Sequence, residues 1–257
     1  MNKILLTILF LLMIYIDKKR GIKLFLSLCF NFIILIIIFY LMALGINPII
    51  TSLIGCLIIS YIILYYVNGE NIKTKSSLQS VVIVLVILAI SIFLMTNLSR
   101  IAGFGFESYE EINMFSYDIN MDFTNITIAI ILISLIGATV DSSVAISSAL
   151  YEVHEHNKKL SKKELFQSGL TVGKDILCTT TNTLLFAFLG DFMTLVIWYY
   201  KGNYTFLEII NSKTFCAEFI KILFSATGCI MIIPITAYIT SINILKEKGG
   251  NNETSHT

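Results

Sequence analysis

Long apolar stretches separated by short polar connections make up almost the whole chain of 257 residues. The stretches lie at 4–16, 24–44, 49–67, 78–98, 126–151, 176–199 and 222–245. A helix of about 20 apolar residues crosses the roughly 30 Å hydrocarbon core of a bilayer, and lipid cannot satisfy an open backbone. The pattern therefore predicts an all-α, polytopic transmembrane helix bundle of about seven spans, with a transmembrane domain at 1–245 and a polar tail at 246–257.

The first stretch, 4–16, is the shortest and runs into the charged sequence 17–23. It has the length of the apolar part of a signal peptide, but no small-x-small cleavage site follows it. We therefore interpret it as an uncleaved, short first helix.

The composition excludes several classes of protein. Charged residues make up 14% of the chain, whereas soluble domains carry about 25%. The apolar stretches take up nearly the whole chain and leave no room for a soluble catalytic domain. No basic stripe indicates a nucleic-acid partner. The five cysteines are scattered without a Cys-x-x-Cys pair, so we expect no disulfide framework, no thiolate metal site and no cofactor. The lipid bilayer is the partner that the composition implies.

The basic residues indicate the orientation in the membrane. The connections at 17–23, 68–77, 152–173 and 246–257 hold most of the 18 lysines and arginines, whereas the connection at 99–123 is acidic. Connections rich in lysine and arginine face the cytoplasm. With seven spans, this predicts a multi-pass protein of the cell (plasma) membrane whose C-terminus is cytoplasmic and whose N-terminus lies outside.

Asp141 is the one charged residue within the stretch 126–151. Placing a carboxylate at the centre of a membrane helix costs roughly 2.5 to 3.5 kcal/mol even on lenient insertion scales. A charge at this depth therefore indicates a functional site.

The stretch with Asp141 and the next one differ from the others because they are rich in small and hydroxylated residues, which let helices approach closely and bond across the contact. Asp141 lies about 16 Å and Asn182 about 12 Å from the cytoplasmic end, at about 1.5 Å per residue. Antiparallel packing would bring them level, and a carboxylate ringed by hydroxyls can bind a proton or a small cation.

The predicted ion-coupling pathway comprises Asp141, Ser142, Ser143, Thr139, Thr179, Thr181 and Asn182. The predicted helix-packing glycines are Gly137, Gly169, Gly173 and Gly190. The alternative is that the hydroxyls bond to the backbone of their own helix and only tighten the packing.

The basic connection 152–173 contains Ser161 and Glu164 at the spacing of a capping box. We interpret it as an amphipathic helix on the cytoplasmic surface, either a plain linker or an element that couples the two spans. His154 and His156 lie two residues apart, which places them on different sides of a helix, and no third ligand is near. We therefore predict no metal site.

The same region carries sequence motifs. Gly137 and Asp141 precede a serine-rich segment, and Glu-Leu-Phe-Gln-Ser-Gly at 164–169, Gly-Lys-Asp at 173–175 and Thr-Thr-Thr-Asn-Thr-Leu at 179–184 follow. In these motifs the chain resembles the YibE/F family of polytopic membrane proteins. The family often has glycine where this chain has Cys178. The resemblance implies pairing with a related YibE/F-type subunit. Seven helices are also few for a complete transport machine, so we expect a homo-oligomer or such a pairing.

More distantly, the order of an aspartate-bearing span, a linker and a threonine-rich span is similar to permeases of the RND and SecD/SecF type. This likeness implies an RND-permease-like half, in which such carboxylates couple to proton or cation flow.

Two functions remain open from the sequence. The first is a permease or transporter subunit in which Asp141 couples to a proton or cation. The second is a non-transporting subunit that helps a membrane complex to assemble. An enzyme is not expected, because the chain shows no Ser/Lys, Ser/His or paired-aspartate arrangement and no His-Glu-x-x-His motif.

Overall fold

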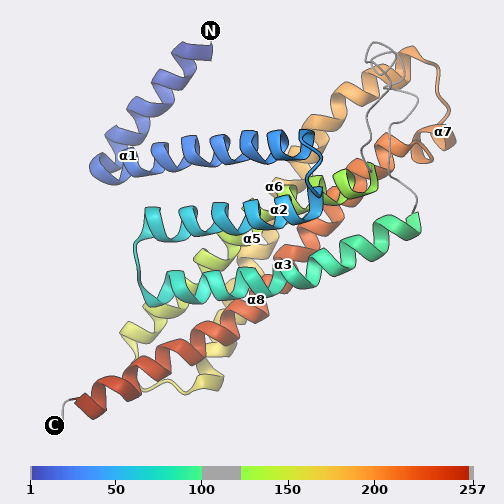
Figure 1. The fold of residues 1–257 in the computed structure, drawn as a ribbon. Helices are drawn as coiled ribbons and strands as arrows, with labels where there is room; N and C mark the ends of the chain where they lie inside the picture. Colours follow the sequence, from blue (N-terminus) through green and yellow to red (C-terminus); the bar gives the residue numbers. More distant parts are fainter. Residues whose placement is uncertain (1, 100–122, 255–257) are drawn as a thin grey trace.

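The computed structural model describes residues 2–99 and 123–254. The acidic side chains of the connection predicted at 99–123 lie outside the described residues. The elements are α1 (Asn2–Ala43), α2 (Pro48–Tyr61), η1 (Ile62–Val67), α3 (Ile72–Ser99), α5 (Phe123–His156), α6 (Lys162–Lys201), α7 (Phe206–Ile210) and α8 (Lys213–Thr254), as Figure 1 shows. Every element of the described residues is helical, which confirms the all-α prediction.

Six helical segments are long and apolar enough to cross a membrane, which supports a multi-pass membrane protein. They are Arg20–Ala43, Pro48–Val67, Ile72–Leu98, Phe123–His156, Lys162–Lys201 and Lys213–Glu247. The segment 2–16 is the seventh apolar stretch of the sequence. It extends only about 22 Å at about 1.5 Å per residue, short of the roughly 30 Å core. By length and composition, six segments of the described residues are therefore candidate spans, one fewer than the apolar stretches of the sequence suggested.

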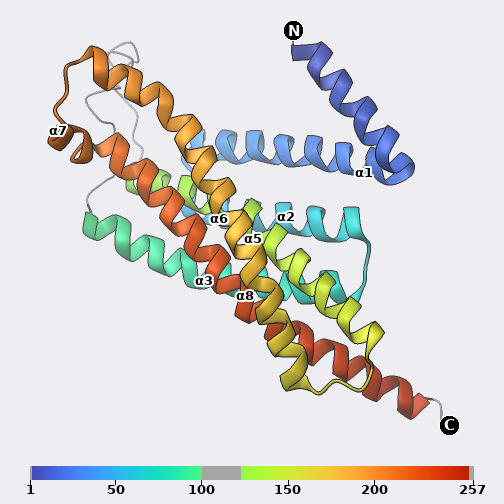
Figure 2. The same cartoon turned by 180° about the vertical axis from the view of Figure 1, so that it is seen from behind.

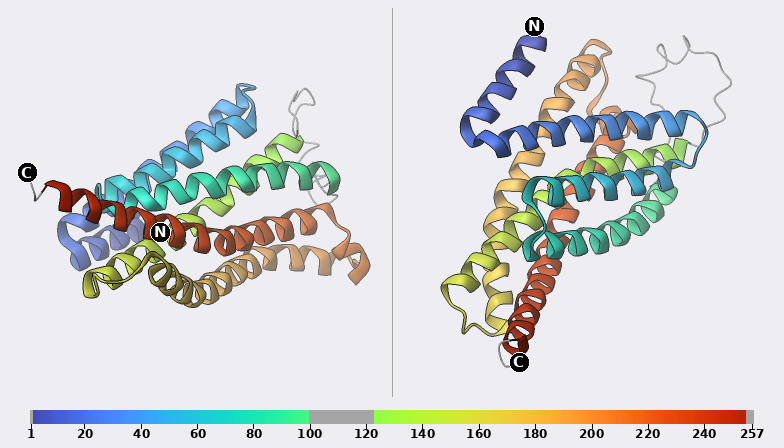
Figure 3. Two further views of the ribbon diagram at one scale, coloured as in Figure 1. Left: turned by 90° about the horizontal axis from the view of Figure 1, so that it is seen from below. Right: turned by 60° about the vertical axis from the view of Figure 1, so that its left-hand side comes forward.

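Helices α3, α5 and α8 form the centre of the bundle. Their buried side chains include Leu85, Leu88, Ile92, Leu132, Leu135, Ile146 and Ile232. Helix α2 packs against α5, and α6 packs against α8 and α5 (Figure 2). In the left view of Figure 3, α2 and the later part of α1 lie on one side and α6 on the other, with α3 and α8 between them. Because lipid is as apolar as these side chains, close packing rather than the hydrophobic effect holds such helices together.

Several buried hydroxyl groups lie between α3, α5 and α8. The Ser77 and Ser147 hydroxyls are 2.7 Å apart, and Ser77 Oγ also donates to the Ser143 carbonyl at 3.2 Å. The Asn243 amide donates to Ser76 Oγ at 2.9 Å. These bonds join α3 to α5 and α8, so small polar residues bring the three helices together where bulky side chains would hold them apart.

The connection between α5 and α6 is shorter than the sequence suggested. The expected capping box is confirmed, since Ser161 and Glu164 bond reciprocally at the start of α6. From there α6 continues without a break to Lys201, and only residues 157–161 lie between the two helices. The expectation of a separate surface helix at 152–173 is therefore wrong, because both spans extend past the apolar stretches as continuous helices.

The polar residues 246–254 likewise continue α8 as helix. A second capping box starts the short helix α7, where the Thr205 backbone N–H and hydroxyl donate to Glu208 Oε2 at 2.7 and 2.8 Å. The backbone bond, followed by the hydroxyl bond, lowers the pKa of the Glu208 carboxyl below its usual value.

The basic connections gather at one end of the bundle. The corner of α1 at Asp17 and Lys18, the turn before α3, the connection 157–161 and the C-terminal end of α8 all lie toward the same end (Figure 1). We call this the basic end.

The corner in α1 folds the segment 2–16 back toward the rest of the helix. Lys18 has a φ of 34°, which is unusual for a residue other than glycine. Phe10 and Phe25 meet across the corner with ring centroids 4.7 Å apart. Gly21 permits this contact, because a β-carbon at Gly21 would overlap the carbonyl group of Met13.

Gly21→Val is therefore expected to open the corner. In a background without the native cysteines, the pair Phe10→Cys and Phe25→Cys should cross-link efficiently, and adding Gly21→Val should abolish the cross-link. Ile22→Val, at an exposed neighbour, is the control and should leave it unchanged. Equal cross-linking in both variants would contradict the close contact at Gly21.

Candidate functional site

Asp141 lies in the middle of α5 on an exposed face of the helix. Its neighbours Ser142 and Ser143 are buried on the other side, against the centre of the bundle. Val144 and Ala145 share the face of Asp141, since residues three and four apart lie on one side of a helix. The carboxylate therefore faces away from α3 and α8.

This face of α5 lines a cavity of about 500 Å³ that α1 and η1 close from the other side. We call it the Asp141 cavity. Its polar lining residues are Arg20, Ser27, Asn31, Asn68 and Asp141. Its apolar lining residues include Met13, Leu24, Leu28, Ile63, Val67, Val144 and Ala145.

Two features of the lining suit a binding site. The side-chain oxygen Oδ1 of Asn31 is buried and has no hydrogen-bond partner, although a buried acceptor of this kind is costly to leave unpaired. The wall opposite α5 includes η1, a π-helical turn that continues α2. Such turns occur often at functional sites.

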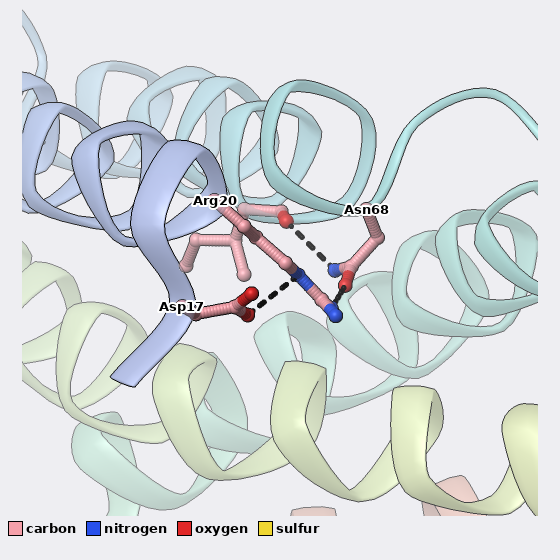
Figure 4. A network of polar contacts seen from close by, with 4 residues as sticks. Asp17, Arg20 and Asn68 are labelled. Atoms are coloured by element: carbon pink, nitrogen blue, oxygen red, sulfur yellow. Dashed lines mark hydrogen bonds and ion pairs between the residues drawn. The ribbon is translucent and has the colours of Figure 1, made fainter. Parts of the chain in front are cut away.

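Arg20, which lines the Asp141 cavity, is held in place by polar contacts (Figure 4). Its Nη2 donates to Asn68 Oδ1 at 2.9 Å, and its Nε lies 3.9 Å from Asp17 Oδ2. The Asn68 amide donates in turn to the Ile63 carbonyl at 3.2 Å, which ties Arg20 to η1. The exposed pair with Asp17 adds little stability, so the main consequence of these contacts is the position of the guanidinium.

Sequence reasoning missed Arg20, Asn31 and Asn68 as parts of the site. One signal was present for Asn31, because it is the only amide in the apolar stretch 24–44. Polar side chains within a span are uncommon and tend to face protein or a cavity.

The threonine and asparagine cluster of α6 lies elsewhere. Thr179 and Asn182 are exposed and Thr181 is half-buried. Thr179 Oγ1 donates to the Ile176 carbonyl at 2.9 Å, within its own helix. No lining residue of the Asp141 cavity belongs to α6.

The expected depth nevertheless fits the packing of the two helices. A β-carbon at Gly169 of α6 would lie 3.0 Å from Leu150 Cδ1 of α5. An equal step of about nine residues along both antiparallel helices then places Asp141 level with Cys178, next to Thr179. By this arithmetic the two groups lie at similar height, but Asp141 lines a cavity with residues of α1 and not with the threonines of α6.

The remaining predicted pathway residues lie in the packed centre. Thr139 Oγ1 donates to the Leu135 carbonyl at 3.0 Å, and Ser143 Oγ to the Val140 carbonyl at 2.8 Å. The hydroxyl of Ser142 is buried without a partner. None of the three lines the Asp141 cavity. Thr139 and Ser143 instead bond to the backbone of their own helix, which is the alternative to a pathway role.

The four glycines fall into two pairs. A β-carbon at Gly169 would lie 2.8 Å from Ala237 Cβ, and one at Gly173 would overlap the side chain of Ile233. Both contacts join α6 to α8. A β-carbon at Gly137 or Gly190 would meet nothing within 4 Å.

The histidines at the end of α5 point apart, as their spacing predicted. His154 is buried, whereas His156 is exposed and its Nδ1 lies 3.0 Å from the Glu152 carbonyl oxygen. Among residues 2–99 and 123–254, no three His, Cys, Asp or Glu side chains gather where they could hold a metal ion.

Comparison with known proteins supports the motif resemblance. The model of the family described as YibE/F-like protein matches residues 5–246. No curated protein matches the chain. No solved structure matches it either, so the likeness to RND and SecD/SecF permeases rests on the sequence pattern alone. Since the family match covers nearly the whole length, the chain belongs to the YibE/F-like protein family.

Proposed function

We propose that the chain is a permease or transporter subunit in which Asp141 couples transport to a proton or a small cation. The observation that carries this proposal is the place of Asp141 on the wall of a cavity of about 500 Å³, halfway along a helix that is long and apolar enough to cross a membrane. In this role the chain moves an ion or a substrate across the membrane and catalyses no reaction.

The charge of Asp141 supports ion coupling. No lysine or arginine whose side chain the structure describes lies within 4 Å of its carboxylate to form an ion pair. A carboxylate inside a membrane span is costly unless it is paired, hydrated or neutralised. Binding a proton or a cation neutralises it, and releasing that ion restores the charge. The oxygens of Asn31 and Ser27 supply further ligands of the kind that hard cations prefer.

The basic end suggests how the protein lies in the plasma membrane. If this end faces the cytoplasm, the C-terminus is cytoplasmic and the Arg20 part of the Asp141 cavity lies toward the same side. The N-terminus lies outside only if segment 2–16 crosses the bilayer, which its length of about 22 Å disfavours.

One observation favours the alternative of an assembly subunit. Helix α6 carries exposed polar side chains at Thr179, Asn182 and Thr183 within a candidate span. Polar groups in a span usually face protein rather than lipid. A second copy of the chain or a related YibE/F-type subunit would cover them, and this pairing serves a permease and an assembly subunit alike.

Blocking the Asp141 cavity tests the proposal. In a background without the native cysteines, Ala145→Cys places a thiol on the cavity wall. Labelling it with a bulky thiol reagent should abolish proton or cation flux into proteoliposomes, because the ion can no longer reach Asp141. The matched control is Ile130→Cys, exposed on the same helix but outside this cavity; its labelling should leave the flux unchanged. Equal flux after labelling at either position would contradict the proposed route.

A further inference from the structure

A second cavity, of about 150 Å³, lies beside the Asp141 cavity at the basic end. Arg20, Asn68 and Val144 line both cavities. The remaining lining residues of this smaller cavity are Asn71, Lys73, Thr74, Ser77 and Ser148. The α1 corner, the turn before α3, the first turns of α3 and the face of α5 next to Asp141 therefore contribute to it.

The charges that line this cavity are all positive. Arg20 and Lys73 enter from different helices, and no lining residue is an aspartate or a glutamate. Lys73 is half-buried, with its Nζ 4.6 Å from the centre of the Tyr151 ring. Arg20 also pairs with Asp17, which is not a lining residue of this cavity, but that pair is exposed and therefore weak. An anion between Arg20 and Lys73 removes the remaining repulsion between these two cations.

The start of α3 adds to this positive character. Asn71 caps the helix, since its Oδ1 accepts from the Thr74 N–H at 3.0 Å while Thr74 Oγ1 accepts from the Asn71 N–H at 3.1 Å. A helix N-terminus favours negative charge through its free N–H groups and its dipole. Thr74 and Ser77 are buried and hydrogen-bonded, so this wall of the cavity is fixed in position.

We infer that this smaller cavity binds a phosphate-type oxyanion between Arg20 and Lys73, either free phosphate or the phosphate of a lipid headgroup. Its volume corresponds to about five water molecules at roughly 30 Å³ each, enough for one tetrahedral oxyanion. The planar guanidinium of Arg20 suits two oxygens of such a group, and the Lys73 ammonium acts as a point charge. This site is separate from the ion coupling at Asp141 and does not depend on it.

Titration of the full-length protein with inorganic phosphate, after delipidation in a neutral detergent, tests the free-anion source. Native mass spectrometry of the protein from phosphatidylcholine nanodiscs with and without phosphatidylglycerol tests the headgroup source. Lys73→Gln should weaken whichever binding is observed on the order of tenfold or more, the usual effect of a lost charged hydrogen bond. Lys73→Arg should restore it.

Lys75→Gln is the matched control, because Lys75 lies on the same helical turn but is exposed outside the cavity. It should bind like the wild type, and the thermal unfolding of each variant shows whether the fold is kept. Saturable phosphate binding lost in Lys73→Gln assigns free phosphate, and phosphatidylglycerol retention lost in that variant assigns a headgroup. Absence of both kinds of binding, or equal losses in Lys73→Gln and Lys75→Gln, would overturn the inference.

Discussion

Gly173→Leu is expected to separate α6 from α8 and to lower the thermal unfolding temperature of the solubilised protein markedly. Even a β-carbon at this position would overlap the side chain of Ile233. Overpacking a well-filled contact costs typically about 1 to 3 kcal/mol, and leucine adds three more carbons to the clash. Gly169→Leu should have a similar effect, because its β-carbon would already lie 2.8 Å from Ala237 Cβ.

Gly190→Leu is the matched control for these two variants. It lies on the same helix, and a β-carbon there would meet nothing within 4 Å. Its unfolding temperature should stay near that of the wild type or rise, since glycine is a poor helix former by about 1 kcal/mol. A loss as large as that of Gly173→Leu would show that α6 does not pack on α8 through Gly169 and Gly173.

Much of the fold could be predicted from the sequence, because apolar length decides which segments can cross a bilayer. The turn into α2 was also readable, since Pro48 opens the helix and Asn47 Oδ1 accepts from the Ile49 N–H at 3.0 Å. The capping box of α6 could also be predicted, because this cap and the turn into α2 are each formed by residues close together in the sequence. The separate linker helix was not, because a polar stretch at the membrane surface can be a loop or simply the end of a long helix.

The site could be predicted only in part. Residue spacing fixes the depth of Asp141, but the direction in which it faces depends on the rotation of α5 about its axis. That helix is apolar or small on all sides, so no polar stripe reveals the rotation. The neighbours that it acquires, Arg20 and Asn31, lie on α1, far away in the sequence. Such a contact follows from the packing of the whole bundle and not from any local pattern.

Asp141→Asn should abolish ion flux while the protein remains folded and assembled. Asparagine keeps the size of the side chain and its place in the cavity, but it can neither release a proton nor bring a negative charge to a cation. If Asp141 couples the ion, the loss should be complete, because it is the one carboxylate among the described residues that line the Asp141 cavity. Elution from size-exclusion chromatography and thermal unfolding should match the wild type.

Asp191→Asn is the matched control for this variant. Asp191 is exposed and lies in the second half of α6, away from the Asp141 cavity. It carries the same chemical change, and its flux should equal that of the wild type. If both variants lost flux equally, the effect would not come from the cavity.

The central claim, that Asp141 is the ion-coupling carboxylate, is tested most directly by proton and sodium flux into proteoliposomes under an imposed gradient. Wild-type protein and Asp191→Asn should carry an ion, and Asp141→Asn should fall to the level of empty liposomes. Full flux in Asp141→Asn would contradict the claim, as would a wild-type protein that carries neither ion but loses its oligomeric assembly when Asp141 is replaced.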